Sequence, residues 1–173
     1  MLLVHKLASF LAASLAVFSC GGATECHHLS SPIDVVVADL PARWSQFESR
    51  ILCVSAQPLA PSWLVSENQM RGELGDERFH AVADLVELLV DGTRENQSPL
   101  RGADLRVPIV SGREQAPVGS WVLGFCRPAI PSDGSRALVR FYSALDYGGT
   151  YLLERCEHGG WAVRWAQYAA YPL

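Results

Sequence analysis

The fold is decided by the stretch from Ser120 to Tyr168, which contains 120-SWVLGFC-126, 136-RALVRFY-142, 149-GTYLLERC-156 and 160-GWAVRWAQY-168. Apolar residues alternate along these four segments, and such alternation indicates β-strands with one buried face. Leu123 and Phe125 share the apolar face of the first segment. Arg140 and Arg164 lie on the opposite face of the second and fourth segments. The pattern predicts an antiparallel sheet that is packed on one side and wetter on the other.

A helix is predicted over residues 77–91, because Phe79, Val82, Val86 and Leu89 recur there at helical spacing. We expect this helix to cover the packed side of the sheet, since an apolar helical stripe needs an apolar surface to bury against. The expected fold class is therefore α+β, with an antiparallel meander sheet of about four to five strands packed against one or two helices.

Other segments are less regular. Residues 50–56 and 105–109 are strand candidates, and Pro108 confines the second of them to a sheet edge or a bulge because proline cannot donate a ladder hydrogen bond. Residues 31–40 suit a helix or a strand equally well. Residues 57–76 contain two prolines and two glycines without a sustained period, so we expect a long loop.

The composition is that of a globular protein and excludes one class of partner. The chain has 173 residues, of which 49% are hydrophobic and 18% are charged, which favours a single domain with a sizeable core. Its net charge is −4. A nucleic-acid partner is not expected, because binding phosphates requires a dense face of lysine and arginine.

The N-terminus is typical of a signal peptide, since Lys6 precedes the uncharged run from Leu7 to Phe18. The run is too short to cross a bilayer core of ~30 Å as a helix, so export is expected rather than permanent insertion. Two processing routes remain open. Cys20 stands in a sequence that resembles a bacterial lipoprotein box and would then carry a lipid, whereas Ala23 would be the last residue removed by ordinary cleavage.

These features divide the chain into a signal peptide at 1–23, a flexible leader at 24–30 and one α+β domain at 31–173. The expected location is periplasmic, secreted or lipid-anchored to a bacterial membrane. Contact with a membrane is expected only through the lipid anchor.

The domain retains four cysteines, Cys26, Cys53, Cys126 and Cys156. An even number in an exported chain predicts two disulfides with three possible connectivities. In a simple meander Cys126 and Cys156 end strands that lie about 9.5 Å apart, which exceeds the ~7 Å that a disulfide spans between Cα atoms. Cys53 is then the natural partner of one of them. The alternative is that some of these thiols are buried as small hydrophobic groups.

Two places hold residues that could line a pocket. His80, Asp84 and Glu87 share one face of the helix predicted at 77–91, where they could act as acid and base if they faced a cleft. A solvated helix face explains them equally. Asp146 and Tyr147 lie beside a glycine turn that could border a pocket, although turn chemistry alone accounts for them.

No catalytic or cofactor motif of high specificity occurs in the chain. We expect no cofactor. The run Cys26-His27-His28 is the densest group of potential metal ligands, but no second pair accompanies it at ligand spacing, so no metal site is expected.

The chain resembles an uncharacterised domain of exported bacterial proteins. The residues that carry the resemblance are 93-TRENQSPL-100, 105-LRVPIVSGRE-114, 121-WVLGFCRP-128, 133-DGSRALVRF-141, 148-GGTYLLER-155 and 159-GGWAVRW-165. The resemblance implies a helix for residues 33–40 and implies no activity. The glycine turn before Trp161 and Val163 is also similar to turns in cystatin-like and nuclear-transport-factor-like sheets.

Two functions are consistent with the sequence. The first is a non-catalytic exported domain that binds a protein, an envelope component or a small ligand, through the loop at 57–76 or the wetter face of the sheet. The second is an enzyme whose pocket lies between the helix at 77–91 and the C-terminal sheet.

Overall fold

The computed structural model describes residues 26–58, 66–95, 99–100, 105–143 and 147–170. Its helices are α1 Pro32–Arg43, α2 Glu67–Leu74, α3 Asp76–Ala81 and α4 Ala83–Glu95. Its strands are β1 Cys26–His27, β2 Leu52–Ser55, β3 Ile109–Val110, β4 Trp121–Phe125, β5 Arg136–Ser143, β6 Tyr147–Arg155 and β7 Trp161–Ala170. The predicted signal peptide at 1–23, with Cys20, and the pocket candidate Asp146 lie outside the described residues.

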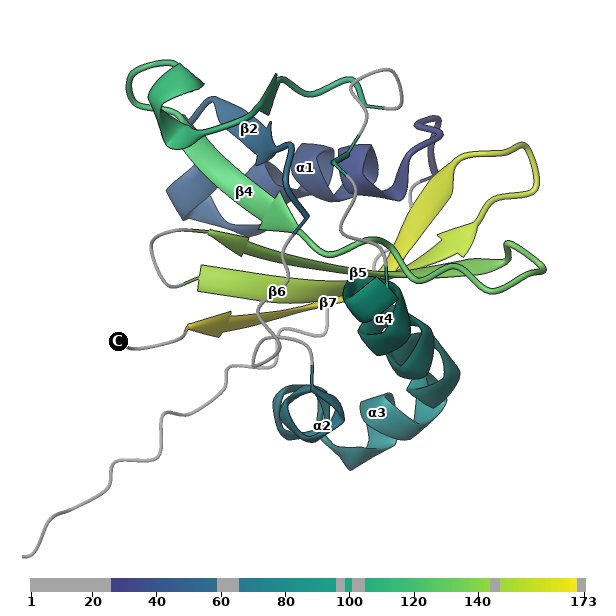
Figure 1. The fold of residues 1–173 in the computed structure, drawn as a ribbon. Coiled ribbons are helices and arrows are strands. Elements are labelled where there is room, and N and C mark those ends of the chain that lie inside the picture. The colour runs from purple at the N-terminus through teal and green to yellow at the C-terminus, as the bar shows by residue number, and fades with distance from the viewer. Residues whose placement is uncertain (1–25, 59–65, 96–98, 101–104, 144–146, 171–173) are drawn as a thin grey trace, which may run out of the picture.

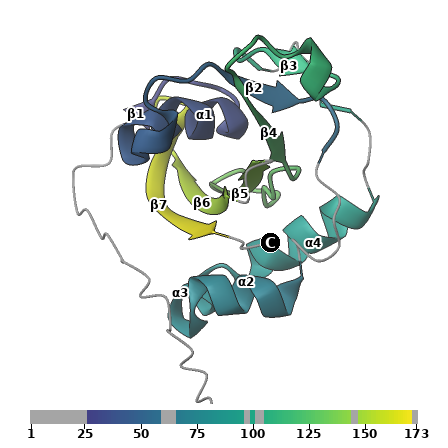
Figure 2. The same cartoon turned by 90° about the vertical axis from the view of Figure 1, so that its left-hand side faces the viewer.

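In the described part of the chain, one mixed sheet has seven strands in the order β1-β7-β6-β5-β4-β2-β3 (Figure 1). Strands β4 to β7 form the predicted antiparallel meander, but β2 runs parallel to both β3 and β4. The sheet curves around α1 as a half-barrel, with α2, α3 and α4 outside it (Figure 2). The expected sheet of four to five antiparallel strands on one or two helices is therefore wrong, although the class α+β holds. Alternation reports which face of a strand is buried and says nothing of the direction of its neighbours.

Strand β3 lies at the sheet edge, as predicted from the sequence, but it is shorter than the predicted strand. It lies at the end of the sheet beside β2 and begins only at Ile109, so the expected strand at 105–109 is wrong in extent. Pro108 precedes it and accepts a hydrogen bond from the backbone N–H of Val54 through its carbonyl, at 2.8 Å. Proline serves here as an acceptor without needing the N–H that it lacks.

Helix α1 covers the face of the sheet that the sequence marks as packed. The segment at 31–40, ambiguous in sequence, is helical, with Pro32 in the first turn. Buried apolar side chains of α1 join those on the concave side of the sheet. The sheet residues in this core include Leu123, Phe125, Val139, Phe141, Tyr151, Leu153 and Trp161. The helix also holds the incoming edge segment, because the buried carboxylate of Asp34 accepts the backbone N–H of Arg106 at 2.9 and 3.0 Å.

Helices α2 to α4 cover the opposite face, which the sequence marks as the wetter one. Their buried side chains pack against Cys126, Ala129, Leu138 and Leu152. The expectation that residues 77–91 cover the face of Leu123 and Phe125 is therefore wrong. Both faces of the sheet are covered by helices. The sequence suggested a wet second face because Arg140 lies on it, but Arg140 is buried there.

Two expectations about helices are corrected as well. The segment at 57–76 contains α2, whose first turn is capped by the Ser66 hydroxyl, which accepts the Gln69 N–H at 3.3 Å. The helix expected at 77–91 is broken at Val82, where the backbone leaves helical geometry with φ −131° and ψ 20°. The break separates α3 from α4 and ends the common face on which His80 and Asp84 were expected.

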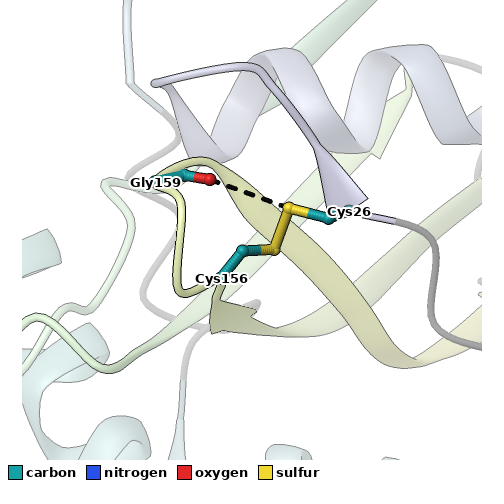
Figure 3. Close-up of a disulfide and its surroundings, with 3 residues drawn as sticks. All are labelled: Cys26, Cys156 and Gly159. Atoms are coloured by element: carbon teal, nitrogen blue, oxygen red, sulfur yellow. Dashed lines mark hydrogen bonds between the residues drawn. A yellow bond between two sulfur atoms is a disulfide. The ribbon is translucent and has the colours of Figure 1, made fainter.

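The N-terminal end of the described chain is attached to the sheet. Cys26 and His27, expected in a flexible leader, form β1 and pair with β7. Cys26 forms a disulfide with Cys156, which follows β6 (Figure 3). Gly160, in the turn between β6 and β7, has φ 83°. A side chain there would overlap the His27 carbonyl, so this turn requires glycine.

The other two domain cysteines are buried thiols. Cys53 pairs with Val122 in the ladder between β2 and β4, and Cys126 lies four positions further along that direction, about 13 Å away. This exceeds the span of a disulfide. The prediction that Cys53 is bridged is wrong, and its reason is the parallel pairing of β2, which the sequence did not reveal.

Candidate ligand-binding pocket

A cavity of about 420 Å³ opens at the end of the sheet where β4 begins and β5 ends. Three separate segments line it: Arg50 before β2, residues 113 and 116–122, and Ser143 at the end of β5. The sheet register brings them together, because β2 lies beside β4 and Ser143 pairs with Leu123. The volume falls within the ~300–1,000 Å³ of pockets that bind small molecules.

A tight turn shapes one wall of the cavity. The backbone N–H and the hydroxyl of Ser120 both donate to the Pro117 carbonyl, at 3.0 and 2.7 Å. Gly119 closes the turn with φ 81°, a conformation that favours glycine. Val118 lies at the tip with its side chain fully exposed, at 104%. The turn therefore holds an apolar side chain in solvent at the rim of the cavity.

Two guanidinium groups lie in the lining. Arg50 and Arg113 are exposed, and neither forms an ion pair with any carboxylate among the described residues. Glu114 follows Arg113 in sequence, but its carboxylate folds back against Gly112. No carboxylate of the described residues therefore neutralises these two arginines.

A buried hydroxyl adds a polar group to the lining. Ser143 is only 1% exposed, and its Oγ has no hydrogen-bond partner within the described ranges. Along β5 it follows Ala137, Val139 and Phe141 on the concave face, which is otherwise apolar. A buried hydroxyl without a partner costs stability, so a bound group that accepts its proton is favoured.

The described residues of the lining offer hydrogen-bond donors and no general base. They include no aspartate, glutamate, histidine, cysteine, lysine or tyrosine. Arginine stays protonated in proteins and cannot act as a general base. Serine becomes a strong nucleophile only beside a base, and no described residue of the lining is one.

The residues proposed from sequence lie elsewhere and are not brought together. His80 is exposed, and its Nδ1 lies 2.6 Å from the Asp76 carbonyl. Asp84 is exposed and pairs with Arg136 at 2.9 Å. Glu87 is exposed as well. Apolar side chains fill the space between these helices and the sheet, so the geometry supports no acid–base pair at that place.

Tyr147 takes part in aromatic packing at the same end of the sheet. Its ring meets Trp44 edge-on, with centroids 5.4 Å apart. Trp44 also packs against Tyr168 and Phe47, with centroid distances of 4.5 and 5.2 Å. Trp121 continues the group through Phe47, at 4.8 Å. Of these rings only that of Trp121 belongs to a pocket-lining residue, so Tyr147 supports the packing and not the cavity.

A pair of phenols lies deeper on the same concave face. The hydroxyls of Tyr151 and Tyr168 are 2.7 Å apart. Burial raises the pKa of Tyr151 well above its ordinary value, and neighbouring Tyr168 and Asp39 add to the effect. Burial raises the pKa of Tyr168 to about 12. Because both pKa values are raised, the two phenols stay neutral across the physiological range. Asp39, beside them, forms an ion pair with Arg43.

A second polar cluster lies on the α2–α4 face. Arg140 is 2% exposed, and its Nη1 and Nη2 donate to the two carboxylate oxygens of Glu73 at 2.6 and 2.8 Å. Nη1 also donates to Thr150 Oγ1 at 2.9 Å. The charge of this arginine is therefore satisfied inside the protein.

The disulfide removes one of the potential metal ligands in the run Cys26-His27-His28. The thiol of Cys26 is bonded to Cys156, so it cannot serve as a thiolate ligand. In the described ranges, no group of three or more histidine, cysteine, aspartate or glutamate side chains could hold a metal ion.

Sequence reasoning did not select the pocket residues Arg50, Arg113 and Ser143. They are 93 positions apart from first to last in the chain, and no local motif joins them. One signal was present for Ser143, because the alternation through Val139 and Phe141 predicts an apolar residue at that position. A polar residue on a buried face is the more informative observation.

Comparison of the chain with protein-family models, curated proteins and solved structures returned no match. In the part of the chain that the structure describes, no helix is both long and apolar enough to cross a membrane.

Proposed function

We propose that the protein is an exported, non-catalytic domain that binds a small ligand in the cavity at the start of β4. The observation that carries this proposal is the cavity of about 420 Å³, whose described lining contains arginines and a buried serine but no general base. Binding requires a shaped cavity with a few polar groups, which is what the lining offers. Catalysis by proton transfer would require a general acid or base, which none of the described lining residues supplies.

Export is supported by the signal-like first 23 residues and by the disulfide between Cys26 and Cys156. Disulfides persist mainly in oxidising compartments. The bridge also fixes where the N-terminal segment leaves the domain. Cys156 lies nine positions beyond Tyr147, which pairs with Ser143 at the pocket, so the exit is about 30 Å from the pocket along the sheet.

The location is tested by expressing the full chain in a bacterium and analysing the mature protein by mass spectrometry. We expect the first 19 to 23 residues to be removed, and an N-terminal cysteine with lipid attached would identify Cys20 as the anchor. After unfolding, Cys53 and Cys126 should react with a thiol reagent while Cys26 and Cys156 remain bonded. Retention of residues 1–23, or four reactive thiols, would contradict export.

The ligand site is tested by screening a collection of small molecules by amide NMR. We expect ligands to shift the signals of residues 116–122 in a saturable manner. The variant Ala116→Trp fills the cavity from its lining and should abolish these shifts. Ala83→Trp introduces the same ring at an exposed position on α4 and should leave them unchanged. A collection that leaves all pocket signals unmoved would refute the site.

A further inference from the structure

We infer that the ligand of this cavity is a small organic molecule with a carboxylate or phosphate group, which is bound by Arg50, Arg113 and the hydroxyl of Ser143. The inference rests on the proposed function and adds the chemical class of the ligand. Its three residues come from three segments that meet only in the folded sheet. Among the described residues, none forms an ion pair with either arginine, and none forms a hydrogen bond with the Ser143 hydroxyl.

The charge of the cavity supports this ligand class. Arg71, Arg136, Arg140 and Arg164 form ion pairs with carboxylates. Arg50 and Arg113 have no such ion pair within the described ranges, and both line the same cavity. Guanidinium groups bind carboxylates and phosphates through paired N–H donors, which match the geometry of these anions.

The buried hydroxyl supplies a further donor. Ser143 has no hydrogen-bond partner among the described residues, although its side-chain oxygen is buried. The Ser143 hydroxyl can donate a hydrogen bond to an anionic oxygen, and the two guanidinium groups can only donate. An acceptor with negative charge therefore suits all three groups, and the arginines set the preference for charge.

The remaining lining indicates that the anion carries an apolar part. Ala116, Pro117 and Val118 form one side of the cavity, and the half-buried Trp121 lies beside them. Ile51 is 55% exposed next to this rim. An inorganic anion would leave these apolar groups in water, while an organic acid or organic phosphate would bury some of them.

A diffusible ligand fits the placement of the cavity better than the surface of an anchoring membrane. Cys26, the first described residue, is bonded to Cys156 at the end of the sheet opposite to Ser143. A lipid on Cys20 would be attached six residues before Cys26, a span of at most about 20 Å, which is shorter than the ~30 Å between Cys156 and the cavity. Two arginines are also fewer than the basic cluster that binding to an anionic lipid surface uses.

The experiment compares probes of one shape and different charge on the folded domain, with amide NMR at residues 116–122. The probes are benzoate, phenyl phosphate and the neutral benzamide, and phosphatidylglycerol vesicles are used in a separate sedimentation arm. We expect benzoate or phenyl phosphate to bind at least about tenfold more tightly than benzamide, because charge-assisted hydrogen bonds dominate. Binding should weaken as salt is raised.

The variants assign the effect to residues. Arg50→Gln and Arg113→Gln should each weaken anion binding about tenfold or more, and Ser143→Ala should weaken it several-fold. Arg164→Gln removes the same charge from an exposed position on β7 and should change nothing. If benzamide binds as tightly as benzoate in the cavity, the anion inference fails while the proposed function stands. If no probe of either kind binds, both fail. Vesicle binding that depends on Arg50 and Arg113 would overturn the diffusible ligand.

Discussion

Two regions of the molecule use arginine at the sheet in opposite ways. On the α2–α4 face, Arg140 is buried and its guanidinium donates to Glu73 and Thr150. At the pocket, Arg50 and Arg113 are exposed and meet no carboxylate within the described ranges. The charge of Arg140 is matched inside the protein and has a structural role, whereas no described carboxylate matches the charges of Arg50 and Arg113.

The free-energy cost of burying a charge explains why Arg140 needs a carboxylate partner on the α2–α4 face. Moving an ion out of water costs several kcal/mol, and only a close partner of opposite charge offsets this. Glu73 lies on α2, so its pairing with β5 also fixes that helix on the sheet. The pocket arginines remain in contact with water and carry no such cost. A substitution that removes a charge should therefore lower the free energy of unfolding much more on the α2–α4 face than at the pocket.

The largest effect is expected for Glu73→Gln, which leaves the charge of Arg140 buried without its counter-ion. We expect the free energy of unfolding to fall by about 3–5 kcal/mol, measured by urea denaturation. The double variant Glu73→Leu with Arg140→Met should recover most of that loss, because apolar groups of similar volume replace the pair.

The surface pair of Asp84 and Arg136 provides the matched control for this experiment. Its atoms are 2.9 Å apart, and the two side chains are 55% and 34% exposed. Asp84→Asn should cost no more than about 1 kcal/mol. An equal loss for Glu73→Gln and Asp84→Asn would contradict the buried role of Arg140.

A smaller effect is expected from alkaline pH, and it separates the two faces of the sheet. The pKa of Tyr168 is raised to about 12 in the folded protein, above the value of about 10 in an unfolded chain. The neutral phenol therefore contributes stability that is complete below pH ~10 and is lost as pH rises toward ~12. We expect Tyr168 alone to lower the free energy of unfolding by about 1 kcal/mol between pH 9 and pH 11, and Tyr151, whose pKa is also raised, to add to this loss.

The phenols can be distinguished from the arginine cluster in the same titration, because Arg140 stays charged throughout this range. Tyr168→Phe should reduce the alkaline loss, while Tyr147→Phe, whose ring packs on Trp44 outside the phenol pair, should retain it. A loss at pH 11 that is unchanged in Tyr168→Phe would refute the assignment. The measurement is urea denaturation at each pH.

Much of the concave face could be predicted from the sequence. Alternation along residues 120–168 predicted β4 to β7, and all four strands are present. Pro108 predicted an edge position, and β3 lies at the edge. These predictions succeeded because proline and alternating apolar residues constrain the backbone locally.

The rest of the fold depends on contacts between distant residues. The neighbours of β2 are chosen by packing, which a single short strand does not encode. From the sequence alone Arg140 is predicted to be exposed, because its partner Glu73 lies 67 positions away. The segment that contains Glu73 was itself predicted to be a loop. The pocket could not be predicted for the same reason, because only the register of the folded sheet brings Arg50, Arg113 and Ser143 together.

The smallest effect is expected where the comparison is most informative, at Arg113. Arg113→Gln and Arg50→Gln should change the free energy of unfolding by no more than about 0.5 kcal/mol without ligand, because no described carboxylate loses a partner. Arg140→Gln should cost several kcal/mol in the same urea assay, since Glu73 would be left buried with its charge. A loss above about 1 kcal/mol for Arg113→Gln would mean that the fold uses this charge internally, and the distinction between the two regions would then fail. A near-zero change would leave ligand binding as the property that this arginine serves, because a charge that the fold does not need remains available to an anion from outside.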